Sequence, residues 1–142
     1  YGVPVRSLQI PINEGGGGAS SPTGGFHWGP SVSWNTYLNC WVMMMGKVEG
    51  KSWQGDKIYI SFNKHKDLGT GNNSQDWSKP ELVFQKPGYI LWYPSLQPLN
   101  DPIDIKEKHT SVKLGKRARF FVKRIKPGDD EYASEHYIEF DK

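Results

Sequence analysis

The pentapeptide WGPSV, at Trp28–Val32, recurs as WYPSL at Trp92–Leu96, and this repeat decides the predicted fold. Both copies read Trp, any residue, Pro, Ser, aliphatic. Each copy is followed by a long apolar strand, VMMM or ARFFV, and then by a strand with alternating aromatic residues, KIYISF or HYIEF. Two copies of such a unit, each with three or four antiparallel strands, predict two neighbouring blades of a β-propeller.

The rest of the chain is also typical of an all-β protein. Helical spacing of apolar residues is almost absent, whereas alternation of apolar and polar residues is frequent. We expect one unit at 1–142, with an edge strand and a Gly-rich loop at 1–25, a first blade at 26–88 and a second blade at 89–142. A β-sandwich of about eight strands is the alternative fold. The expected strands are Val3–Ile12, Ser31–Trp34, Tyr37–Met45, Lys57–Phe62, Glu81–Gln85, Tyr93–Leu99, Arg117–Ile125 and His136–Phe140.

Composition narrows the class of protein. The chain has 142 residues, enough for one domain with a hydrophobic core, and its six Trp, seven Tyr and six Phe exclude a disordered chain. A net charge of +3 is too small to indicate nucleic-acid binding, and no segment is long and apolar enough to span a membrane. Cys40 is the single cysteine, so we expect a buried thiol, no internal disulfide and no multi-cysteine metal site. No cofactor is predicted.

One segment of the first predicted blade resembles a known family. Ile58–Leu82 contains IYISF, then KDL, then WSKPEL. This order is similar to the blade signature of five-bladed propeller glycosidases of the arabinanase, xylosidase and invertase type, and the resemblance covers Phe26–Phe140. It implies four-stranded blades around a funnel, with a sugar bound on the axis at one face. It also implies that Asp67 caps a turn and that Trp77 packs between neighbouring blades.

The resemblance puts hydrolysis by this chain in doubt. In many of these glycosidases the catalytic acid is a Glu directly before Gly-Pro, and here Trp28 holds that position in FHWGP. An indole cannot protonate a leaving group, and glycoside hydrolysis needs a pair of carboxylates. Asp101 and Asp104 follow the second repeat, but Asn-Asp-Pro is more typical of a turn. We therefore expect no catalysis by this chain alone and assign no catalytic residue.

Aromatic side chains beside polar groups suit a carbohydrate ligand. Sugar rings stack on Trp or Tyr, while amide, carboxylate and imidazole groups bond the hydroxyls. His27, at the start of an innermost strand, could bind a hydroxyl, act as a base or hold a metal, and the structural alternative is a hydrogen bond to the neighbouring loop. Trp41 and Trp53 are expected to pack in the core or between blades. The predicted sugar-binding residues are His27, Trp28, Trp34, Asn35, Trp92, Tyr93 and Asp101.

Two blades do not close a ring, so they need partners. A lone pair exposes two apolar faces and an unpaired strand edge. Because the chain begins with Tyr1 and not Met, we expect further blades upstream, and self-association is the other solution. The sequence thus predicts the carbohydrate-related C-terminal part of a glycosidase-like propeller, secreted or periplasmic. The alternatives are a non-catalytic carbohydrate-binding β module and a structural or assembly domain.

Overall fold

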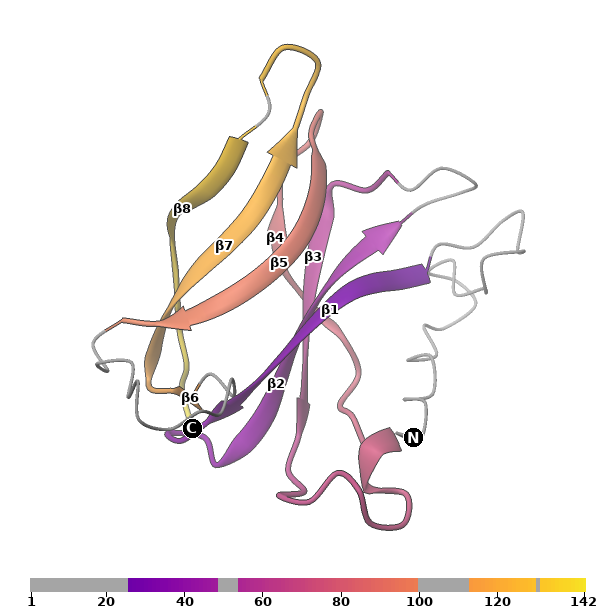
Figure 1. The fold of residues 1–142 in the computed structure, drawn as a ribbon, viewed down its shortest axis with the longest axis vertical. Helices are drawn as coiled ribbons and strands as arrows, with labels where there is room; N and C mark the ends of the chain where they lie inside the picture. The colour runs from indigo at the N-terminus through magenta and orange to yellow at the C-terminus, as the bar shows by residue number, and fades with distance from the viewer. Residues whose placement is uncertain (1–25, 49–53, 100–112, 130) are drawn as a thin grey trace.

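The computed structural model describes residues 26–48, 54–99, 113–129 and 131–142 (Figure 1). These residues form β-strands and one short 3-10 helix at Asn73–Gln75, so the all-β prediction is confirmed. The predicted strand at Val3–Ile12, the Gly-rich loop, Trp53 and Asp101 lie outside the described residues.

The strands form two sheets. In the first, four antiparallel strands follow one another along the chain, and the short strand β6 adds to β1 in parallel, which gives the order β4-β3-β2-β1-β6. The second sheet is antiparallel with the order β5-β7-β8, so it has three strands and not the four of the predicted blade, because β6 pairs with the first sheet. The strands are β1 (Phe26–Asn35), β2 (Cys40–Val48), β3 (Lys57–Asn63), β4 (Glu81–Gln85), β5 (Ile90–Pro98), β6 (Lys113–Leu114), β7 (Arg117–Ile125) and β8 (Glu131–Glu139).

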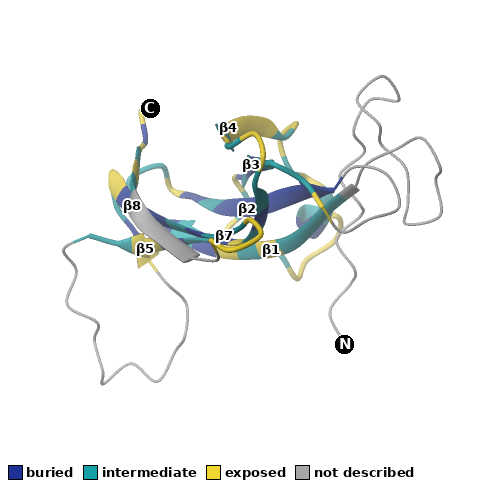
Figure 2. Cartoon of the chain, turned by 90° about the horizontal axis from the view of Figure 1, so that it is seen from above, coloured by how far each residue is buried: buried dark blue, intermediate teal, exposed yellow. Residues whose placement is uncertain are grey.

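The alternation in RARFFVKRI sets the two faces of β7. Ala118, Phe120 and Val122 are almost completely buried, while Arg119 and Phe121 point to the other face and are only partly covered. This is the two-residue period of a strand with one face in a core. The strand β2 behaves differently, because its residues are buried on both faces, from Val42 through the three methionines to Val48 (Figure 2).

One hydrophobic core lies between the two sheets. The first sheet contributes residues of β2 and β3, and the second contributes residues of β5 and β7. The ring of Phe84 on β4 lies 5.5 Å from the ring of Phe120 on β7, so the contact extends across both sheets. Cys40 is buried in this core as predicted, and burial raises the pKa of its thiol. The core residues are Cys40, Val42, Met44, Ile58, Ile60, Leu91, Leu96, Leu114, Ala118, Phe120, Val122 and Phe140.

The first turn lies further along the chain than the sequence predicts. We expected a turn at Asn35-Thr36 and a strand from Tyr37, but β1 continues to Asn35 and the turn is Thr36–Asn39. The side-chain oxygen of Asn35 accepts the backbone N–H of Leu38 at 2.8 Å, and Asn39 has a positive φ of 56°. An Asn side chain that bonds its own turn, followed by an Asn in the left-handed region, explains why two apolar residues sit in a turn.

Candidate functional site

The two repeat segments have the same backbone structure. In β1, Trp28 pairs with Gly46 and Ser31 pairs with Met44, so β1 carries one extra residue. In β5, the equivalent pairs are Trp92 with Lys123 and Ser95 with Phe121, with the same extra residue. Each repeat therefore encodes a β-bulge near the start of its strand.

The variable position of the repeat provides the bulge geometry. Gly29 has a φ of 57° and Tyr93 has a φ of 53°, both in the left-handed region. The proline that follows lacks a backbone N–H and is tolerated at bulges, where the ladder of hydrogen bonds is interrupted. The pattern Trp-x-Pro-Ser is thus a bulge signature, and the bulges place Trp28 and Trp92 at matching points of β1 and β5.

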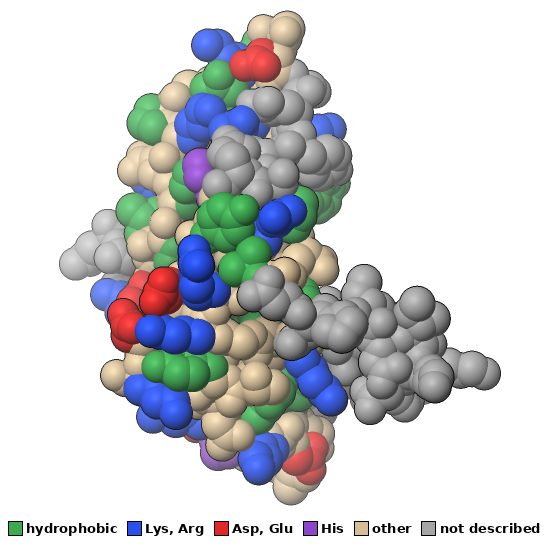
Figure 3. All heavy atoms as spheres, turned by 90° about the vertical axis from the view of Figure 1, so that its left-hand side faces the viewer, with side chains coloured by type: hydrophobic (Ala, Val, Ile, Leu, Met, Phe, Trp, Pro, Cys, Tyr) green, Lys and Arg blue, Asp and Glu red, His purple; other side chains and the backbone are tan. Residues whose placement is uncertain are grey.

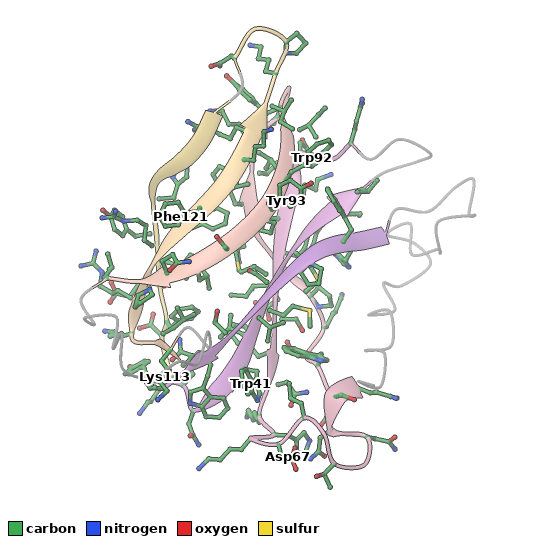
Figure 4. All side chains as sticks on the ribbon, viewed as in Figure 1. Trp41, Asp67, Trp92, Tyr93, Lys113 and Phe121 are labelled. Atoms are coloured by element: carbon green, nitrogen blue, oxygen red, sulfur yellow. The ribbon has the colours of Figure 1, made fainter. Side chains whose placement is uncertain are left out.

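The bulges bring three predicted site residues into one aromatic cluster, which we define as Trp28, Trp92 and Tyr93. The ring centroids of Trp28 and Trp92 are 5.6 Å apart with planes at 89°. Trp28 and Tyr93 are 5.6 Å apart, and Trp92 and Tyr93 are 5.9 Å apart. Such edge-to-face contacts are favourable beyond the area that they bury. The cluster therefore joins the first sheet to the second near the start of β5 (Figure 4).

A glycine in β2 allows Trp28 to lie close to the sheet. A Cβ atom on Gly46 would stand 3.3 Å from Nε1 of Trp28 and 3.5 Å from the carbonyl oxygen of Leu91. Both sheets approach at this point, so a side chain here would push the indole away from Trp92. The lack of a side chain at Gly46 is part of what positions the cluster.

Tyr93 is the exposed member of the cluster. Its side chain is 51% exposed, whereas Trp28 and Trp92 are partly buried. Tyr93 thus offers a ring to solvent while its neighbours hold it in place. An exposed, positioned aromatic ring is the arrangement that stacking on a ligand requires.

His27 lies next to the cluster but on the other side of β1. It pairs with Lys47 across the sheet, and its ring lies 4.9 Å from the ring of Tyr59. Both ring nitrogens are buried, and neither has a hydrogen-bond partner among the described residues. Burial first, and then the positive charge of Lys47, lower the pKa of His27 to about 4. The imidazole is neutral at pH 7, and its buried nitrogens are not open to a ligand in this conformation.

Trp34 and Asn35 lie at the far end of β1 and do not join the aromatic cluster. The ring of Trp34 packs edge-to-face on Trp41 at 5.2 Å. Asn35 is fully buried, and its amide nitrogen donates to the carbonyl oxygen of Gly115 at 3.1 Å. Its amide oxygen holds the turn described above, so Asn35 offers no surface to a ligand. A sugar contact by Trp34, as predicted, would therefore be separate from the cluster.

Several carboxylates are held by structural partners. Asp67 accepts hydrogen bonds from the Gly69 N–H and from the Thr70 hydroxyl, which lower the pKa of its carboxyl group, and its predicted role as a turn cap is confirmed. Trp77 follows in the same loop, and its indole donates to the carbonyl of Ser74 at 3.0 Å. The other partnered carboxylates are Asp56 with Gln85 and Lys57, Asp76 with His65, Asp129 with Tyr89, and Glu139 with Lys116 and Arg117.

A pocket that the sequence analysis missed lies beside the cluster. It has a volume of about 560 Å³ and runs along β5 to the partly covered face of β7. We expected only a strand with a solvated face at Arg117–Ile125. The signal was the alternation itself, because Arg119 and Phe121 share a face opposite to Phe120. The lining residues are Tyr93, Ser95, Gln97, Pro98, Leu99, Arg119 and Phe121.

Comparisons with protein-family models, with curated proteins and with solved structures find no match to this chain. Among the described residues, no helix has the length and apolar character needed to cross a membrane. Within the same residues, no group of three or more His, Cys, Asp and Glu side chains is arranged to hold a metal. The resemblance to propeller glycosidases therefore rests on the sequence motifs, and the function is argued from the site itself.

Proposed function

We propose that this chain binds carbohydrate, and that it does so as two neighbouring units of a glycosidase-like β-propeller that are not catalytic on their own. The observation that carries the proposal is the aromatic cluster. Two matching bulges, in strands from different sheets, bring Trp28, Trp92 and Tyr93 together and leave one ring exposed. Aromatic rings that are fixed in this way stack on the C–H faces of sugars.

The arrangement of the strands supports the propeller part of the proposal. The first sheet contains four consecutive antiparallel strands, β1 to β4, and the second begins with β5, whose bulge matches that of β1. In a propeller the first strand of each blade is the innermost one, so β1 and β5 would line the axis. The cluster would then lie at the end of the axis where these strands begin. A location outside the cytoplasm, where polysaccharides are found, belongs to the same proposal.

The chemistry of the cluster favours binding over hydrolysis. Trp28 occupies the position where the resemblance places a catalytic Glu, and the N–H of an indole is far too weak an acid to protonate a leaving group. Asp56, Asp67 and Glu139 form ion pairs or turn hydrogen bonds. The described residues thus supply stacking rings at this place, which suits the binding of a saccharide.

The test is a glycan array on the intact chain and on Trp28→Ala and Trp92→Ala. We expect both variants to lose binding about fivefold, since aromatic contacts of this kind contribute about 1 kcal/mol each. Trp41→Ala is the matched control, because it also removes one partner of an edge-to-face Trp pair, at the other end of β1. Trp34→Ala tests the separate prediction that Trp34 contacts sugar.

The outcomes separate binding from folding. All variants are checked by near-ultraviolet circular dichroism and thermal unfolding. Equal loss of binding in Trp41→Ala and Trp28→Ala would show that the cluster has no special role. Absence of binding to every glycan would overturn the proposal and leave the role of a structural or assembly domain, which the exposed apolar side chains of Val32, Leu82 and Val83 favour.

A further inference from the structure

The pocket beside the aromatic cluster contains one charged side chain, Arg119, among its lining residues. Its volume of about 560 Å³ lies in the range of small-ligand sites, about 300–1,000 Å³. Two aromatic side chains, Tyr93 and Phe121, form part of the wall, and Ser95 and Gln97 add a hydroxyl and an amide. The pocket is thus an open surface depression lined by a cation, two rings and neutral polar groups.

Arg119 contacts Tyr137 and forms no ion pair with a carboxylate of the described residues. One terminal nitrogen lies 3.4 Å from the hydroxyl of Tyr137, to which it donates, and the guanidinium carbon lies 5.6 Å from the centre of that ring. The Nε atom is buried and has no hydrogen-bond partner among the described residues. Arg117, two residues earlier on the same face of β7, is instead paired with Glu139 at 3.6 Å. The charge of Arg119 is therefore oriented but not neutralised by a described carboxylate.

An anion is the ligand that this arrangement fits. The two terminal nitrogens of a guanidinium present N–H groups that match the two oxygens of a carboxylate, and in Arg119 these are the nitrogens that can reach a ligand, since Nε is buried. Figure 3 shows Lys and Arg side chains beside hydrophobic ones on the side of the molecule where β8 lies, with Asp and Glu side chains among them. The pocket shares Tyr93 with the aromatic cluster, so one ligand can extend from the cluster into the pocket.

We propose that the pocket binds the carboxylate of an acidic sugar, a hexuronate unit of the saccharide that the aromatic cluster holds. Arg119 binds the carboxylate, Tyr93 and Phe121 cover the faces of the ring, and Gln97 and Ser95 bond its hydroxyls. This inference rests on the sugar-binding part of the proposed function and narrows it to acidic polysaccharides. The pocket runs along β5, the edge strand of its sheet, on the face of β7 that points away from the shared core.

The test measures binding of the intact chain to an oligogalacturonide, to its methyl ester and to a neutral oligosaccharide by isothermal titration calorimetry. Arg119→Gln should lower the affinity for the oligogalacturonide about tenfold or more, because hydrogen bonds to a charged group contribute about 1.5–3 kcal/mol. The wild type should bind the methyl ester about as weakly as Arg119→Gln binds the acid. Arg119→Lys keeps the charge but loses the paired N–H groups of the guanidinium. Its affinity for the oligogalacturonide should lie between those of the wild type and Arg119→Gln.

Arg117→Gln is the matched control, because it removes the same charge from the same face of β7 outside the pocket. Its affinity should stay within about threefold of the wild type, as expected for an exposed charge. An equal effect of Arg117→Gln and Arg119→Gln would overturn the assignment, and so would equal binding of acid and ester. Tighter binding of a dextran sulfate oligosaccharide, which carries sulfate groups and no carboxylate, or of an oligothymidylate than of the oligogalacturonide would also overturn it. If neutral and acidic sugars bind alike through Trp28 and Trp92, the pocket assignment fails while the proposed function stands; if no saccharide binds, both fail.

Discussion

Tyr93 has an unfavourable backbone conformation and lies between the aromatic cluster and the pocket. A side chain other than glycine in the left-handed region costs about 1–2 kcal/mol, and Tyr93 has a φ of 53°. Gly29 adopts the same conformation at the equivalent place of the first repeat without that cost. The second repeat thus has an aromatic residue at a position whose backbone conformation glycine would adopt at a lower free energy. That ring contacts both indoles of the cluster and lines the pocket.

Replacing Tyr93 by Gly and by Ala separates the backbone from the ring. Tyr93→Gly relieves the backbone strain, whereas Tyr93→Ala keeps it, so Tyr93→Ala should be less stable than Tyr93→Gly by about 1 kcal/mol. Both variants should lose saccharide binding to the same extent. The measurements are urea unfolding and the glycan array. Equal stability of the two variants would contradict the positive φ, and retained binding would exclude a ligand contact by the ring.

His27 makes the stability of this chain sensitive to acid. Its pKa is about 4 in the folded chain against an ordinary value of 6.5, so only the unfolded chain binds a proton between these values. The contribution of His27 is complete above about pH 6.5 and is lost progressively as the pH falls to about 4. In His27→Gln we expect the free energy of unfolding to fall less between about pH 7 and pH 4.5 than in the wild type. Denaturant unfolding at these two pH values measures the difference, and identical pH profiles would contradict a buried, neutral imidazole.

At the scale of the element, strands with one buried face could be predicted and their pairing could not. KIYISF and RARFFVKRI alternate, so β3 and β7 were placed correctly. The strand β6 was missed, because the two residues Lys113–Leu114 have no periodicity. It exists because Leu114 is buried in the core and its carbonyl accepts the N–H of Thr36 at 2.8 Å. Contacts between residues that are distant in the sequence determine whether so short a strand forms.

The sequence also predicted only part of the candidate site. The repeat signalled Trp28, Trp92 and Tyr93 as equivalent residues, and their contact follows from two bulges that the same motif encodes. The buried structural role of Asn35 was not visible, because it depends on a hydrogen bond to Gly115, far along the chain. Arg119 was missed because the pocket requires the register of β5 against β7, and local sequence does not fix that register.

Two neighbouring phenylalanines of β7 test which face of the strand lies in the core and which lines the pocket. Phe120 is 2% exposed and lies in the core, whereas Phe121 lines the pocket. Phe120→Ala should reduce the free energy of unfolding by about 3–5 kcal/mol, the usual cost of emptying a buried aromatic site. Phe121→Ala should reduce it clearly less and should weaken saccharide binding. Chemical denaturation and calorimetry measure the two effects, and a reversed order of stabilities would mean that the faces of β7 are misassigned.

At the scale of the whole molecule, apolar side chains are exposed on elements of both sheets. Leu82 and Val83 on β4 are exposed, and β4 is the edge strand of its sheet, while Tyr93 and Tyr137 are exposed on the second sheet. Exposed apolar side chains on an edge strand favour association, with further blades or with other copies of the chain. This agrees with the expectation that two such units need a partner.

Self-association gives a direct test at this scale. The apparent mass of the wild type in sedimentation velocity should rise with concentration, and Leu82→Lys should shift the chain toward monomer because it places a charge on the apolar edge strand. Gln85→Lys is the matched control, since it adds the same charge to the same strand without removing an apolar group. A wild type that stays monomeric at every concentration would contradict the paired-unit arrangement.

The parallel pairing of β6 with β1 has a consequence for how the chain becomes folded. The residues Thr36 and Asn35 of the first sheet bond to Leu114 and Gly115, which come from the later half of the sequence. A polypeptide severed between Gly88 and Tyr89 would therefore yield two fragments that each lack part of the shared interior. We expect neither fragment to be stable when expressed separately, and co-expression to restore both. The repeat divides the sequence into halves, but the interlocked strands make those halves a single cooperative folding unit.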